Sequence, residues 1–118
     1  FVTMVPDSRF AVYGVKADLA AGWVENALTW ENLPGCDDHG VVSGQVEKVA
    51  EFWLPRGGSG EPLTIRGDAL AAFVRASRSR LVTFLLVRET GESDSTGLVH
   101  AFASKEHPTA RPPTLRLR

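Results

Sequence analysis

The residues best suited to chemistry cluster first in one short stretch, Cys36-Asp37-Asp38-His39. A thiolate, carboxylates and an imidazole are all metal ligands. The spacing fits no zinc signature, because adjacent residues rarely point at the same ion. Asp37 and Asp38 could join loop carbonyls around calcium, but the DxDxDG pattern of a calcium loop is absent. The stretch therefore indicates a solvated loop, and we predict no metal and no cofactor.

Catalysis by a hydrolase would need a nucleophile beside a base and an orienting acid. The candidate bases are the three histidines, His39, His100 and His107. No G-x-S-x-G elbow is present, and Ser104-Lys105 lacks the S-x-x-K spacing of serine–lysine chemistry. The sequence therefore predicts that the chain is not an enzyme.

Tryptophans offer a different chemistry, since exposed aromatic rings stack on the faces of sugar rings at a low entropy cost. Trp30 lies in a predicted strand and is expected in the core, although Trp23 and Trp30 flank a polar Glu-Asn pair. Trp53 alternates away from Phe52 and Leu54, so it is the better candidate for an exposed platform.

Arginines at outward strand positions could complete such a surface, because guanidinium groups pair carboxylates and sulfates in bidentate fashion. The same arginines could serve only solvation and edge protection. They are Arg66, Arg116 and Arg118. The predicted ligand-binding face combines aromatic and basic side chains, namely Tyr13, Trp53, Arg66 and Lys105.

The composition limits the classes of protein to which the chain can belong. A length of 118 residues suits one domain with a modest core. The net charge of −1, from 13 basic and 14 acidic residues, gives no basic footprint for nucleic acid. No apolar run is long enough to span a membrane. Cys36 is the single cysteine, so an intrachain disulfide is excluded.

Short apolar runs between glycines and prolines must position these residues, and this pattern is typical of all-β proteins. Residues 9–16 and 80–88 are apolar on both faces, so we place each in the middle of a sheet. Residues 46–54 form a further extended segment. Weaker strands are predicted at 28–30 and 63–66, and alternation predicts another at 114–118.

The chain has one plausible helix, which begins at Asp68 as N-cap and ends near Ser77. Leu70, Phe73 and Val74 form its apolar stripe. The fold predicted from these elements is a jelly-roll-like antiparallel β-sandwich with one short helix. Its expected core between two sheets consists of Trp30, Phe84, Leu86, Phe102, Leu115 and Leu117.

Two blocks of sequence go beyond generic β patterning. The first contains Val12-Tyr13-Gly14, Trp23, Glu25 and LTWENLPG at residues 28–35. The second contains FASKE at 102–106 and PPTL at 112–115. Together they resemble the DNRLRE domain, a module similar to the alginate-binding carbohydrate-binding modules.

The resemblance implies a β-sandwich in secreted or cell-surface bacterial proteins, appended to larger chains. The expected function is non-catalytic binding of a polysaccharide, including an anionic one, or surface adhesion. A purely structural β-module, such as a spacer, stalk or assembly subunit without a small ligand, is the alternative.

The block that usually precedes these motifs in the family, of the type KSYLRFDL, is not found here. We therefore expect residues 1–118 to form a single module that lacks its N-terminal strands. The sheet edge beside residues 1–16 would then be open, to be completed by the rest of a larger polypeptide or by another chain.

Overall fold

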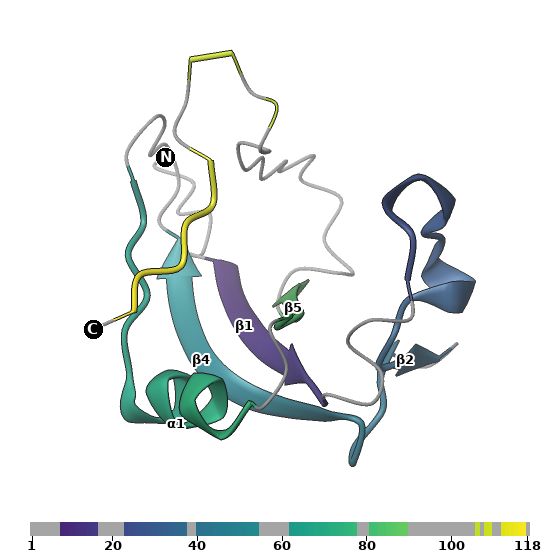
Figure 1. Cartoon of the computed structure of the whole chain (residues 1–118), viewed down its shortest axis with the longest axis horizontal. Helices are drawn as coiled ribbons and strands as arrows, with labels where there is room; N and C mark the ends of the chain where they lie inside the picture. The colour runs from purple at the N-terminus through teal and green to yellow at the C-terminus, as the bar shows by residue number, and fades with distance from the viewer. Residues whose placement is uncertain are drawn as a thin grey trace, which may run out of the picture.

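The computed structural model describes residues 8–16, 23–37, 40–54, 62–77, 81–89, 106, 108–109 and 112–117. Here the chain is mostly strand with one short helix, and its sheets are antiparallel, which confirms an all-β fold in outline. A three-stranded sheet has the order β4-β1-β5, and β2 pairs with β3 (Figure 1). The strands are β1 (Ser8–Val15), β2 (Cys36–Asp37), β3 (Gly40–Val41), β4 (Val46–Leu54) and β5 (Phe84–Arg88).

β1 is the central strand of the larger sheet, as its apolar faces predict. It pairs with β4 on one side and with β5 on the other. Ala11 and Val15 are only 0% and 1% exposed. The strand of residues 8–15 is thus bordered on both sides by strands of the same chain. Residues 1–7 lie outside the described residues.

A β-bulge interrupts the pairing of β4 with β1. Between Val12 and Tyr13 the register shifts by one residue, which leaves Val49 as the extra residue. Residues three apart in a regular strand point to opposite faces. The bulge instead brings Lys48 and Glu51 to one face, where Nζ and Oε2 are 3.4 Å apart.

The helix α1 (Asp68–Ala76) packs on one face of this sheet, beside β4 in Figure 1. Its Phe73 ring lies 5.7 Å from the ring of Phe84 on β5. The same ring lies over Gly14, where any Cβ would overlap it. A glycine near the end of β1 therefore lets the helix approach the sheet closely.

The predicted helix is confirmed, but its N-terminus differs in one detail. Gly67 is the N-cap and Asp68 is the first helical residue, with no side-chain cap hydrogen bond. The Asp68 carboxylate still lies near the positive end of the helix dipole. The helix ends at Ser77, whose N–H lies 3.2 Å from the carbonyl oxygens of both Phe73 and Val74.

The strand predicted at residues 28–30 is wrong. The segment instead contains two 3-10 helices, η1 (Glu25–Ala27) and η2 (Trp30–Asn32). The N–H of Thr29 donates to Oδ1 of Asn32 at 2.7 Å, and the Asn32 amide donates back to the last carbonyl of η1. This local network competes with strand pairing and closes the chain into turns.

Three other segment assignments also change. Residues 36–45, expected as a loop, contain the β2–β3 hairpin. Residues 62–67 and 112–117 have no regular secondary structure, although alternation predicts strands there. Alternating side chains specify which face of a sheet would be buried, but a strand also needs a partner for its backbone groups.

Within the described part of the chain, the core lies along β1. Leu86, Leu115 and Leu117 are 45%, 45% and 72% exposed, so their predicted burial is wrong, and Phe84 is half-buried. In the described sheet β5 has one neighbouring strand, β1, rather than a central position. Phe102 and the side chain of Trp30 lie outside the described residues. Among the residues that the structure describes, the buried apolar ones are Phe10, Ala11, Val12, Val15, Val49 and Leu85.

Candidate functional site

The two faces of the larger sheet differ in chemistry. Phe10 stacks on Phe52 at 5.5 Å on the face that α1 covers. The opposite face carries the alternate residues of β1, and we call it the Trp53 face because Trp53 lies directly opposite Arg9. Polar and charged side chains gather at one end of this face, and they form the candidate site.

Glu89, just after β5, is the centre of this cluster. Its carboxylate accepts hydrogen bonds from Arg9 Nε at 3.1 Å and from the Tyr13 hydroxyl at 3.0 Å. Lys48 Nζ lies 3.2 Å from its Oε1. The Glu89 side chain is 17% exposed, whereas that of Arg9 is 36% exposed. One carboxylate therefore holds together side chains from β1 and β4.

Glu51 supplies a second carboxylate on β4. Its Oε1 lies 3.0 Å from Arg9 Nε, and its Oε2 lies 3.4 Å from Lys48 Nζ. Arg9 and Lys48 are thus each bridged by the same two carboxylates. The four charged groups form a closed network of two cations and two anions, which we call the charged cluster.

The cluster shifts the ionisation of its members. Burial alone would raise the pKa of Glu89, but hydrogen bonds from Tyr13 and Lys48, together with nearby positive charge, hold its pKa below the ordinary value. Burial and the hydrogen bond to Glu89 raise the pKa of Tyr13. Glu89 is therefore an anion at neutral pH and Tyr13 is a neutral phenol.

Lys48 is also locked into its charged form. Desolvation would lower the pKa of Lys48, but its bonds to Glu89 and Glu51 outweigh that effect and raise the pKa. A lysine with a raised pKa is a poor general base at neutral pH, since it rarely releases its proton. This arrangement suits binding and positioning better than proton transfer.

Trp53 borders the charged cluster and is more exposed than Tyr13, the other aromatic side chain there. It is 53% exposed, and the Arg9 guanidinium lies 5.7 Å from the centre of its ring. Arg9 is held from the other side by Glu51 and Glu89. The indole is therefore oriented by a restrained neighbour while about half of its surface stays open to solvent.

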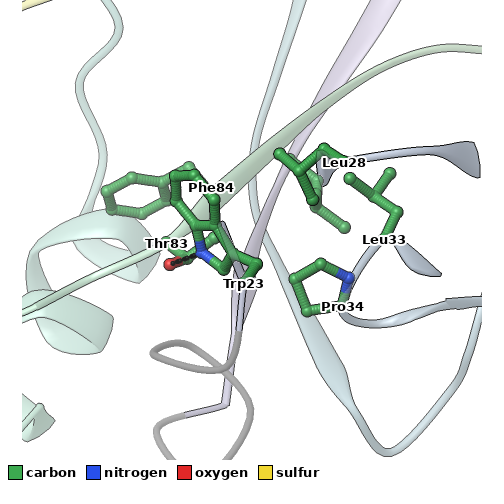
Figure 2. Close-up of a pocket in the computed structure, with 7 residues that line it drawn as sticks. Trp23, Leu28, Leu33, Pro34, Thr83 and Phe84 are labelled. Atoms are coloured by element: carbon green, nitrogen blue, oxygen red, sulfur yellow. Dashed lines mark hydrogen bonds between the residues drawn. The ribbon is translucent and has the colours of Figure 1, made fainter. Parts of the chain in front are cut away.

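A second feature is an apolar hollow between the 23–35 segment and the start of β5. Figure 2 shows Trp23 and Phe84 facing Leu28, Leu33 and Pro34 across it. The Trp23 indole N–H donates to Oγ1 of Thr83 at 3.2 Å. Its volume of about 130 Å³ is below the several hundred Å³ typical of small-molecule sites. We interpret it as a packing defect between two segments.

The structure brings together only part of the predicted ligand face. Tyr13 and Trp53 lie on the same sheet face, four residues of β1 apart in register. Arg66 is exposed in the irregular segment before α1 and takes no part in the charged cluster. Lys105 lies outside the described residues.

Four residues of the candidate site were not predicted, namely Arg9, Lys48, Glu51 and Glu89. A signal was available for Arg9, because it occupies an alternating position of the same predicted strand as Tyr13 and therefore shares its face. No sequence signal marks Lys48 and Glu51 as neighbours, since their spacing places them on one face only when the Val49 bulge is known.

Cys36 lies outside the charged cluster, at the start of β2. Burial and the nearby charge of Asp37 raise the pKa of its thiol. A raised pKa lowers the fraction of reactive thiolate. Within the described part of the chain, no group of three or more His, Cys, Asp or Glu side chains is placed to hold a metal ion.

Known protein families, curated proteins and solved structures yield no match to this chain. The class of the protein therefore rests on its own architecture, an antiparallel β fold with one short helix. Across the residues that the structure describes, no helix is long and apolar enough to cross a membrane.

Proposed function

We propose that this chain is a non-catalytic, secreted or cell-surface module that binds polysaccharide through the Trp53 face. The main observation that supports this proposal is the exposed Trp53 indole beside a restrained network of hydrogen-bonding groups. An aromatic ring offers a flat apolar surface to the C–H face of a pyranose, and adjacent polar groups fix the orientation of its hydroxyls.

The proposed module is a jelly-roll-like β-sandwich of the DNRLRE type. Support comes from the sequence blocks around Val12-Tyr13-Gly14 and LTWENLPG. In the structure, Gly14 gives α1 close access to the sheet, and Gly35 at the end of LTWENLPG adopts a φ of 80°. Both motifs of the first block therefore contain a position at which the fold requires glycine.

The test is retention of the full 118-residue chain on a glycan array that includes alginate and sulfated polysaccharides. Trp53→Ala should abolish retention of the bound glycan, because truncating a stacking platform removes a main source of affinity. Trp23→Ala is the matched control, since this tryptophan is 39% exposed but lies in the apolar hollow. Retention of no glycan by the folded wild-type chain would refute the proposal.

A structural β-module without a small ligand is the second candidate. Several exposed apolar side chains favour it, among them Val24, Leu81 and Leu86, which are 67%, 59% and 45% exposed. Such side chains could pack against another part of a larger protein. Complete absence of glycan retention would favour this candidate over the first, whereas retention that survives Trp53→Ala would contradict it and would place the glycan-binding surface away from Trp53.

A further inference from the structure

We infer that the Trp53 face selects an uncharged polysaccharide over an anionic one. This inference rests on the proposed function and specifies its ligand class. It starts from the charge balance of the face on which the ligand would lie, because an anionic ligand needs cations that its own charge can reach without meeting anions first.

Both cations of the charged cluster already face carboxylates. Arg9 Nε lies 3.0 Å from Glu51 and 3.1 Å from Glu89, and Lys48 Nζ lies 3.4 and 3.2 Å from the same two groups. The cluster therefore carries two positive and two negative charges. Its net charge is zero at neutral pH, because the pKa of Glu89 is lowered and that of Lys48 is raised.

An anionic sugar on Trp53 would meet carboxylates as well as cations. Arg9 lies over the Trp53 ring, but Glu51 is bonded to Arg9 and its side chain is 42% exposed. A uronate or sulfate that approaches Arg9 would thus come close to Glu51. To pair with Arg9 alone, the ligand would have to displace a carboxylate from an existing ion pair.

An uncharged sugar meets no such conflict. Its hydroxyl groups donate to carboxylates and accept from ammonium or phenol groups, so a mixed set of donors and acceptors suits it. The side chains of Lys48 and Glu51 are 40% and 42% exposed, which leaves part of each open to a ligand. The C–H face of an uncharged pyranose would stack on Trp53 beside these groups.

The experiment compares pairs of polymers built from related sugars, one neutral and one anionic. The pairs are hydroxyethyl-cellulose with carboxymethyl-cellulose, galactan with polygalacturonate, and mannan with alginate. Affinity electrophoresis of the wild-type chain should show retention by a neutral polymer and about tenfold weaker retention by its anionic partner. Binding of the neutral polymer should change little between about 20 and about 500 mM salt.

Glu51→Gln removes one negative charge from the cluster and should increase retention by the anionic polymer of the preferred pair. Glu31→Gln makes the same charge change on η2, away from the sheet, and should not. Preference of the wild type for an anionic polymer, with steep salt dependence, would overturn this inference and leave the proposed function standing. Failure of all six polymers and of the glycan array would overturn both.

Discussion

Two tryptophans lie in different surroundings within the described structure. Trp23 lies in the apolar hollow, where its indole N–H is satisfied by Thr83. Trp53 borders the charged cluster, with Arg9 over its ring. The first indole has one polar partner and apolar walls, and the second has polar neighbours and an open surface.

The comparison shows that exposure alone does not make an aromatic residue a binding platform. The two indoles are 39% and 53% exposed, a modest difference. What separates them is the set of donors and acceptors beside each ring, which the hollow lacks and the charged cluster supplies. A polar ligand therefore has partners at Trp53 and meets mostly apolar side chains at Trp23.

The largest loss of stability is expected from a substitution in the segment that lines the apolar hollow. Gly35→Ala should lower the free energy of unfolding by about 3 kcal/mol. Gly35 has a φ of 80°, and an added Cβ would overlap Cγ1 of Val46. Gly44→Ala is the matched control, with a φ of 93° and no neighbour within 4 Å. Chemical denaturation measures the stability of both variants. Equal losses of stability in the two would show that crowding against Val46 contributes nothing.

A smaller effect is expected at the charged cluster. Glu89→Gln should lower the free energy of unfolding by about 1 kcal/mol, because the carboxylate joins three side chains but the ion pairs are partly solvated. Glu47→Gln, an exposed position of β4, is the control and should change it little. Denaturant titration at neutral pH measures both. If Glu89→Gln were as stable as the wild type, the charged cluster would orient its side chains without stabilising the fold.

The lowered pKa of Glu89 predicts how the stability contributed by the charged cluster depends on pH. The pKa of Glu89 is lowered in the fold, so its contribution to stability is complete at neutral pH and is lost as pH falls below about 4.3. The stability difference between wild type and Glu89→Gln should therefore shrink towards zero in acid. A difference that stays constant down to about pH 2 would show that Glu89 titrates as it does in the unfolded chain.

The smallest loss of stability is expected from removing the hydrogen bond between Trp23 and Thr83 in the apolar hollow. Thr83→Val keeps the side-chain shape and removes the acceptor of the Trp23 N–H, which should cost about 0.5 kcal/mol or less because the contact is exposed. The indole N–H resonance of Trp23 should shift in an NMR spectrum. Thr64→Val, in the irregular segment before α1, should leave that resonance unchanged.

Local sequence was sufficient for the elements with strong patterns. Two apolar faces marked β1 as a central strand, and the stripe of Phe73 and Val74 marked α1. It was insufficient where backbone pairing decides the outcome. The alternation at 114–118 and at Leu63 predicts strands, yet residues 112–117 and 62–67 have no regular structure.

The candidate site was predictable only in part. Alternation alone distinguished Trp53 from Phe52, so an exposed aromatic on β4 followed from the period of a strand. Arg66 was placed in the same set because a strand was expected there. Because residues 62–67 form no strand, Arg66 has no sheet register that would place it beside Trp53.

The sequence by itself determined the class of fold and the position of Trp53, because both follow from local periodicity and turn residues. The tertiary structure decided the composition of the charged cluster. Glu89 and Arg9 are 80 residues apart along the chain, and only the pairing of β5 with β1 brings them together. The bulge at Val49 then places Lys48 beside Glu51, because one extra residue reverses the face to which a strand residue points.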